Sequence, residues 1–285
     1  MPEIQTVAVI GAGTMGSGIA QVAAAAGLPV RMIDASADAL NKGVQRVHDS
    51  LTRLAKKGTI SAADAEATSK RVKPAADLSE AKDSDIVIEA IFEDETVKRE
   101  TWKKLDAFCR PAAIFASNTS SISITRLAAV VKNPERFAGM HFFNPVPVMK
   151  LVEVIRGNRT SDETCAAVVE LSKRLGKTAI EVNDYPGFVS NRVLMPLINE
   201  AIFAVYEGVA KPEAIDEIFK LGMAHPMGPL TLADFIGLDV CLNIMEVLVR
   251  GFGDPKYRPC PLLRQMVDSG KLGRKSGMGF YTYDK

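Results

Sequence analysis

The sequence predicts an α/β protein in which a mostly parallel β-sheet with helices on both faces is followed by an all-helical C-terminal domain. Three observations predict this architecture. A glycine-rich turn joins the first apolar run to a helix-like stretch, and strand-length apolar runs then alternate with helical periodicity as far as the turn-rich segment 183–187. Beyond that segment almost everything has helical character. We therefore expect one domain over residues 1–184 and a second, helical domain over residues 185–285.

The glycine-rich turn carries the fingerprint GxGxxG, with Gly11, Gly13 and Gly16 placed between a strand and a helix. In a Rossmann-type fold these glycines allow a tight turn, close approach of a pyrophosphate and close helix packing. The next predicted strand ends in Asp34, 18 residues after Gly16, where a carboxylate can bind ribose hydroxyls and would repel a 2′-phosphate. NAD is therefore the expected cofactor. The alternative is a purely structural glycine-rich turn.

A helical excursion from the sheet follows. Residues 36–57 have helical periodicity, and Ser61 is the expected N-cap of a second helix that runs to about Val72. On the first helix, residues at steps of three and four form one polar and basic stripe, namely Lys42, Arg46, Ser50, Arg53 and Lys57. This stripe is a candidate surface for an anionic ligand.

The alternation of strands and helices then resumes. The expected strands are 85–91, 113–117, 137–143, 151–156 and 177–182, and the expected helices are 94–109, 122–130 and 162–175. In the second domain we expect helices over 188–207, 212–220, 230–249 and 261–269. Residues 193–205 carry more apolar positions than one helix face needs, which favours a subunit or interdomain contact over burial within their own domain.

Bulk composition is that of an ordinary globular protein. The chain has 285 residues, 47% of them hydrophobic and 24% charged, with a net charge of +1, so nothing indicates a nucleic acid or a membrane as partner. Its 4 cysteines are scattered and form no metal-binding spacing, so reduced thiols and no metal are expected. The first strand begins almost at Met1 and no apolar run approaches the ~18 residues of a membrane span, so we expect a cytoplasmic location.

Of the 3 histidines, His141 is the candidate for chemistry. His48 lies in a charged helix and His225 in a proline-rich turn, whereas His141 ends a predicted strand, where ligands bind in open α/β sheets. Glu153 lies inside an apolar strand, and a buried carboxylate there needs a donor. If the loop with Pro145 folds the chain back, Glu153 can accept a hydrogen bond from His141 and leave the other ring nitrogen as a base. Alternatively, Glu153 faces solvent on an edge strand.

Other polar residues border the same predicted crevice. The segment with Ser120 follows a strand end, and its hydroxyls can cap the next helix or bind a substrate oxygen. Asn191, at the domain junction, is either a substrate donor or an ordinary helix-end residue. Glu93 and Lys98 follow a strand near the expected nicotinamide position, although both have an alternative as solvated helix charges.

The sequence resembles the L-3-hydroxyacyl-CoA dehydrogenase family, including its bacterial 3-hydroxybutyryl-CoA members, over essentially the whole chain. The matching motifs are GAGTMG at 11–16 with Asp34, ASNTSSISI at 116–124, GMHFFNPVPVMKLVEVI at 139–155, PGFVSNR at 186–192 and HPMGP at 225–229. The resemblance implies that His141 is the catalytic base and Glu153 its orienting partner, with Ser120 and Asn191 in the active site.

The resemblance also implies the binding residues. Glu93, Lys98, Asn144 and Lys275 match positions that contact NAD, while Ser50 and Lys57 match positions that contact coenzyme A. It implies oxidation of a 3-hydroxyacyl-CoA to a 3-ketoacyl-CoA and the reverse reduction, with a short acyl chain favoured, and a homodimer formed through the helical domain. Two alternatives stay open, namely a sugar-acid or hydroxy-acid dehydrogenase of the same layout and a non-catalytic NAD-binding protein.

Overall fold

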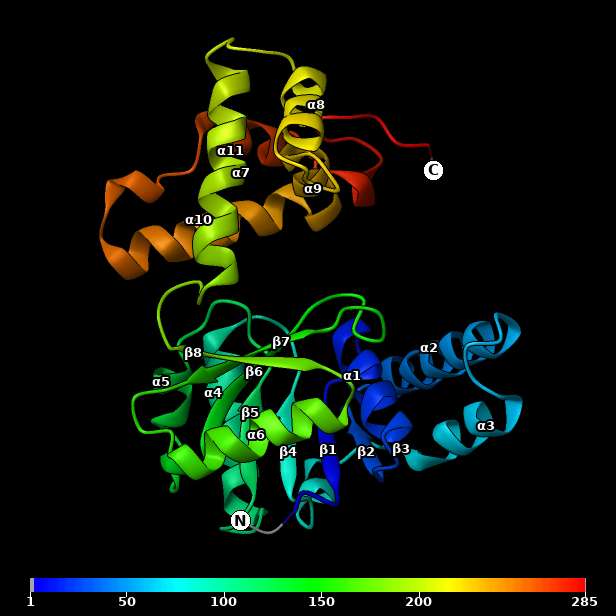
Figure 1. The fold of residues 1–285 in the computed structure, drawn as a ribbon. Helices are drawn as coiled ribbons and strands as arrows, with labels where there is room; N and C mark the ends of the chain where they lie inside the picture. Colours follow the sequence, from blue (N-terminus) through cyan, green and yellow to red (C-terminus); the bar gives the residue numbers. More distant parts are fainter. Residues whose placement is uncertain (1–2, 285) are drawn as a thin grey trace. The chain divides into compact units, whose positions relative to one another are not determined.

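The computed structural model describes residues 3–284 and divides into two compact units, residues 1–184 and residues 185–285 (Figure 1). The first unit contains one sheet of eight strands in the order β3-β2-β1-β4-β5-β6-β7-β8. Its strands are β1 (Val7–Ile10), β2 (Val30–Ile33), β3 (Val72–Ala75), β4 (Ile86–Glu89), β5 (Ile114–Ser117), β6 (Phe137–Phe142), β7 (Leu151–Arg156) and β8 (Thr178–Asn183). All neighbouring strands are parallel except β6 and β7, which confirms the predicted α/β fold.

Helices cover both faces of this sheet (Figure 1). They are α1 (Thr14–Ala25), α2 (Ala37–Lys56), α3 (Ala62–Arg71), α4 (Glu95–Phe108), α5 (Ile124–Ala128) and α6 (Asp162–Arg174), with short 3₁₀ turns η1 (Leu78–Ala81) and η2 (Pro134–Arg136). Helix α1 packs on β1 and β2, and α6 packs on β6, β7 and β8. One core cluster of the unit is almost wholly aliphatic, and β1 and β4 are buried along their whole length. Three further buried side chains, Trp102, Phe115 and Phe137, pack their aromatic rings against one another.

The predicted helical excursion is present as α2 and α3. Ser36 and Ser61 cap the two helices by accepting from the N–H groups of Ala39 and Asp64. The strand β3 that follows was not predicted. It contains Pro74, which lacks a backbone donor, and a proline is tolerated here because β3 lies at the edge of the sheet.

The second unit is helical (Figure 1). It contains α7 (Ser190–Tyr206), α8 (Pro212–Gly222), α9 (Pro229–Ile236), α10 (Leu238–Phe252) and α11 (Pro261–Asp268), with the 3₁₀ turns η3 (Pro255–Tyr257) and η4 (Arg274–Ser276). A separate apolar core holds these helices together, formed mainly by α7, α9, α10 and α11.

The prediction of a single helix over residues 230–249 is wrong. Gly237 separates α9 from α10 and has a φ of 106°, a conformation outside the helical region that glycine adopts readily. Apolar residues continue on both sides of this glycine, so the hydrophobic pattern shows no interruption where the backbone direction changes.

Candidate functional site

The glycine fingerprint forms a tight turn between β1 and α1. Gly11 has a φ of 103°, and a Cβ there would lie 2.6 Å from the Ala90 carbonyl oxygen. A Cβ on Gly16 would collide with the carbonyl of Gly11, whereas a Cβ on Gly13 would meet nothing within 4 Å. Gly13 also precedes α1 with no side-chain cap on the helix. The open space and uncapped helix N-terminus fit a pyrophosphate, as the sequence predicts.

Asp34 lies beside this turn at the end of β2. Its carboxylate accepts hydrogen bonds from the backbone N–H groups of Ala12 and Ser36, each at 2.9 Å. These two bonds fix the carboxylate against the turn while the residue stays partly exposed. A carboxylate held in this way has lone pairs left for ribose hydroxyls, so the residues present fit NAD.

His141 and Glu153 face each other across the antiparallel pair β6 and β7. They are direct partners in the strand register, and His141 Nδ1 lies 2.8 Å from Glu153 Oε2. The exposed fractions are 6% for His141 and 3% for Glu153. The alternative that Glu153 faces solvent on an edge strand is wrong, because β7 lies between β6 and β8. The geometry places the Nδ1 proton toward the carboxylate and leaves Nε2 as the basic nitrogen.

The turn after β5 approaches the same strand end. Asn118 Oδ1 accepts from the backbone N–H of Phe142 at 2.8 Å, which ties this turn to the residue directly after His141. The side chain that caps the next helix is Ser123, which accepts from Arg126 N–H. Ser120, the predicted active-site serine, lies two residues beyond Asn118. Asn118 was not singled out from sequence, although it stands inside the motif that carries the family resemblance.

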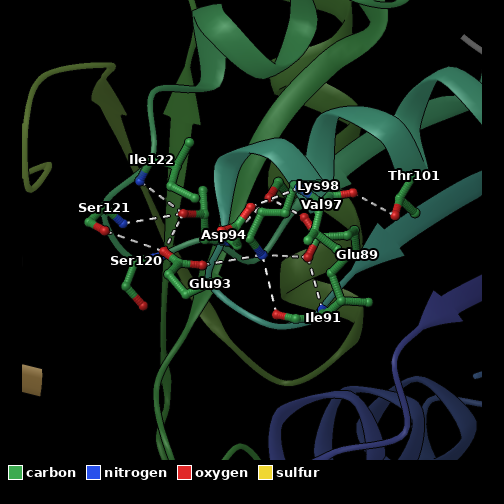
Figure 2. A network of polar contacts seen from close by, with 12 residues as sticks. Glu89, Ile91, Glu93, Asp94, Val97, Lys98, Thr101, Ser120, Ser121 and Ile122 are labelled. Carbon is green, nitrogen blue, oxygen red and sulfur yellow. Dashed lines mark hydrogen bonds and ion pairs between the residues drawn. The ribbon is translucent and has the colours of Figure 1, made fainter. Parts of the chain in front are cut away.

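Glu93 and Lys98 meet at this edge of the sheet (Figure 2). The Lys98 side chain is 1% exposed and that of Glu93 is 40% exposed. The alternative that Lys98 is a solvated helix charge is therefore wrong. Its main partner is Glu89, a buried carboxylate that the sequence analysis did not identify, although a glutamate in an apolar strand is the same signal that pointed to Glu153.

A pocket of about 580 Å³ lies between α1, α2 and the loop 144–148. Ser50 and Lys57, predicted to contact coenzyme A, line it together with Asn144, Arg46 and Arg53. Three basic side chains, from Arg46, Arg53 and Lys57, thus border one cavity. Four residues of the predicted basic stripe and the loop after His141 therefore share a cavity whose basic side chains suit an anionic ligand.

The loop 144–148 is anchored by a residue that sequence reasoning missed. Lys177 is 8% exposed, and its ammonium group donates to the carbonyls of Val146 at 2.5 Å and Met149 at 2.8 Å. Burial lowers the pKa of Lys177 below its ordinary value. A lysine at the start of an apolar strand was the only sequence signal.

Two predicted site residues belong to the second unit. Asn191 lies in the first turn of α7 and is 8% exposed. Lys275 pairs with Asp239, with Nζ 2.5 Å from Oδ1. Their contacts with substrate and cofactor stay predictions.

Residues 3–284 contain neither a cluster of metal ligands nor a membrane-spanning helix. No group of three or more histidine, cysteine, aspartate or glutamate side chains in this range is arranged to hold a metal ion. No helix in this range has the length and apolar character needed to cross a membrane.

Burial raises the pKa of the Cys165 thiol to about 11 and of the Cys109 and Cys241 thiols to about 12, so these three thiols are protonated at neutral pH.

Comparison with known proteins agrees with this geometry. The family model of the 3-hydroxyacyl-CoA dehydrogenase NAD binding domain matches residues 6–185, and that of the 3-hydroxyacyl-CoA dehydrogenase C-terminal domain matches residues 187–283. The chain belongs to the 3-hydroxyacyl-CoA dehydrogenase family. It is accordingly an oxidoreductase of the 3-hydroxyacyl-CoA dehydrogenase type, and its cofactor is NAD.

Three relatives show how close the match is to individual members of the 3-hydroxyacyl-CoA dehydrogenase family. A probable 3-hydroxybutyryl-CoA dehydrogenase of Bacillus subtilis is 60% identical, with 99% of each chain covered. The 3-hydroxybutyryl-CoA dehydrogenase of Bradyrhizobium diazoefficiens is 52% identical, covering 98% of this chain and 96% of the relative. The crystal structure of (S)-3-hydroxybutyryl-CoA dehydrogenase from Ralstonia eutropha matches with a TM-score of 0.97 at 55% identity, covering 99% of this chain and 100% of that one.

Proposed function

We propose that the enzyme interconverts (S)-3-hydroxybutyryl-CoA and acetoacetyl-CoA with NAD, using His141 as general base and Glu153 as its orienting partner. The observation that carries this proposal is the buried His141–Glu153 pair, with Nδ1 2.8 Å from Oε2, at the carboxyl edge of the sheet. The short-chain substrate is supported by the relatives in Bacillus subtilis and Bradyrhizobium diazoefficiens, which carry that name.

The chemistry of the pair follows from its hydrogen bond. NAD, when bound, supplies the hydride acceptor for oxidation, and NADH the donor for reduction. His141 Nε2 takes the proton of the substrate 3-hydroxyl, and Glu153 stabilises the resulting imidazolium and keeps the ring in the correct tautomer. In the reverse direction the imidazolium returns that proton to the reduced ketone. Ser120 and Asn191 orient the substrate oxygen.

The pocket beside α2 is the proposed site for the coenzyme A portion of the substrate. Coenzyme A carries several phosphate charges, and the pocket offers Arg46, Arg53 and Lys57 on one side. The loop 144–148 lines the opposite side and begins three residues after His141. The same loop thus connects the proposed base to the proposed coenzyme A site.

We also propose a homodimer formed through the second unit. Several of its large apolar side chains are more than half exposed within the single chain, among them Val193, Tyr206, Val209, Ile218 and Leu221. Large apolar side chains exposed in this number favour a protein contact.

The decisive experiment is the His141→Gln variant in the reduction of acetoacetyl-CoA by NADH. Loss of a general acid and base is expected to lower kcat by about 10² to 10⁴-fold. NADH binding, measured by fluorescence, should be retained. His48→Gln is the matched control, because His48 is exposed on α2 and does not line the pocket. Near-normal turnover of His141→Gln would remove the basis of the proposal.

A further inference from the structure

Glu89 is a fully buried carboxylate at the carboxyl end of β4. It accepts hydrogen bonds from Lys98 Nζ at 2.5 Å, Ser117 Oγ at 2.7 Å and the backbone N–H of Ile91 at 2.9 Å. The three donors come from α4, from β5 and from the loop after β4. An ionised carboxylate in such an apolar position is stable only with this degree of pairing.

Lys98 connects Glu89 to a second carboxylate (Figure 2). Besides Glu89, its ammonium group lies 3.2 Å from Glu93 Oε2 and 3.4 Å from the Ile91 carbonyl oxygen. An ammonium group has three donors, and these three acceptors match them. The side chains of Lys98 and Glu89 are buried, whereas that of Glu93 is partly exposed.

Glu93 in turn holds the turn that carries Ser120. Its Oε1 accepts from the Thr119 hydroxyl at 2.5 Å, from the backbone N–H of Ser120 at 2.9 Å and from the Ser121 hydroxyl at 3.4 Å. The side chain of Ser120 points away from Glu93 (Figure 2). The Glu93 carboxylate therefore fixes the backbone of this turn, and the Ser120 hydroxyl is directed to the side of the turn away from Glu93.

We propose that Glu89 is a positioning residue that holds Ser120 in place through Lys98 and Glu93. The inference rests on the proposed function, in which Ser120 orients the substrate oxygen. The turn 118–123 lies between β5 and α5 and contains no regular secondary structure of its own. Charge-assisted hydrogen bonds anchor it to the rigid end of β4. Displacement of a substrate-orienting group by about 1 Å costs up to about 10²-fold in rate, so a distant buried carboxylate can control turnover.

The first test is Glu89→Gln, which keeps the shape of the side chain and removes its charge. Lys98 then has only the partly exposed Glu93 as counter-ion, and the turn is less firmly held. We expect kcat for acetoacetyl-CoA reduction to fall by about 10 to 100-fold, with KM for acetoacetyl-CoA changed much less. Glu100→Gln is the matched control, because Glu100 is exposed on α4, the helix that carries Lys98, and forms its ion pair with Lys103.

A double-mutant cycle with Ser120→Ala separates positioning from general damage. If Glu89 acts through Ser120, Glu89→Gln will lower kcat by less than about twofold when Ser120 is already alanine. An equal loss in both backgrounds would overturn the proposal. Should Glu89→Gln fold poorly because it leaves a buried charge unpaired, Glu89→Gln/Lys98→Met removes that charge and must show the same non-additive loss.

Hydrogen exchange provides a readout that is independent of turnover. In Glu89→Gln, amide exchange in a peptide covering residues 118–123 should accelerate at least about tenfold, while Glu100→Gln should leave it unchanged. Unchanged exchange in Glu89→Gln would refute the positioning role even if the substrate were a different hydroxy acid. Conversely, faster exchange in an enzyme inactive on acetoacetyl-CoA would reject the proposed substrate and keep the positioning role.

Discussion

Three carboxylates of the first unit have different main donors, and they lie directly after β2 (Asp34), at the end of β4 (Glu89) and inside β7 (Glu153). Asp34 accepts from backbone N–H groups, Glu89 from an ammonium group and Glu153 from an imidazole. Backbone donors leave a carboxylate fixed and charged for a ligand, whereas an ammonium partner forms a structural support. An imidazole partner can both donate and accept a proton, so of the three carboxylates we propose only Glu153 as a support for proton transfer.

A substitution of Lys57 tests the proposed coenzyme A site. Lys57→Ala removes one positive charge from the pocket beside α2, and we expect KM for acetoacetyl-CoA to rise several-fold with little change in kcat, because an exposed ion pair contributes modestly. Steady-state kinetics at low ionic strength measures both constants. Lys56→Ala is the control, since Lys56 is exposed and does not line the pocket. An equal rise in KM for a thioester that lacks the nucleotide would contradict the assignment.

The sequence could predict a contact where both partners lie in one short motif. Glu153 and His141 were paired in advance because one motif contains both. Glu89 was not, since its partner Lys98 lies on the next helix, and Lys98 looked like one of many charged residues on that helix. Burial of a lysine depends on what packs around it, and the pattern of one helix does not contain that information.

Among the elements, β4 is held by side-chain hydrogen bonds at its start as well as at its end. Asp85, just before β4, accepts from the backbone N–H groups of Gln5 and Thr6 at 2.9 Å and 2.8 Å and from Arg110 at 2.7 Å. Burial raises the pKa of this carboxyl, but these bonds and that of the Thr6 hydroxyl together hold the pKa below its ordinary value. The chain before β1 and the turn before β5 are thus joined through one side chain.

This contact predicts a pH-dependent stability. A lowered native pKa means that the ionised form is favoured on folding, so the stabilisation is present above the ordinary aspartate pKa of about 4 and is lost as pH falls through the native value. We expect Asp85→Asn to lower the free energy of unfolding by about 1–2 kcal/mol at pH 7. Urea unfolding at pH 7 and near pH 3 checks this. A difference that does not shrink at the lower pH would show that the carboxylate charge is not responsible.

Most elements follow from the alternation of apolar runs and helical periods, and the two errors, at β3 and at Gly237, have causes that hydrophobic periodicity does not record. β3 is short, contains Pro74 and gains its stability from pairing with β2, so its own residues give little strand signal. Gly237 changes the chain direction between α9 and α10 without changing the apolar pattern. Neither tertiary pairing nor a positive φ can be recognised from hydrophobic periodicity alone.

For the whole molecule, the proposed homodimer accounts for the apolar surface of the second unit. On α8, Ile218 is 57% exposed and Leu221 is 78% exposed. We expect sedimentation velocity to show a dimer at micromolar concentration and the Ile218→Asp/Leu221→Asp variant to shift toward monomer, because charges in an apolar interface are costly to bury. Glu217→Gln, an exposed neighbour on α8, is the control. A monomeric wild-type enzyme, or a variant that stays dimeric, would exclude this helix from the interface.

In the arrangement that we propose, helix α2 sets a fixed distance between the NAD site and the coenzyme A site. Its start is attached to Asp34 through the Ser36 N–H, beside the expected ribose of NAD, and its C-cap is Lys57, beside the proposed coenzyme A site. Its 20 residues span about 30 Å as a rigid rod. Each inserted or deleted residue would rotate Lys57 by about 100° around the axis, so only changes of whole turns would keep its direction. With coenzyme A bound where we propose, the length of the helix in residues is as much a part of substrate recognition as the charges that it carries.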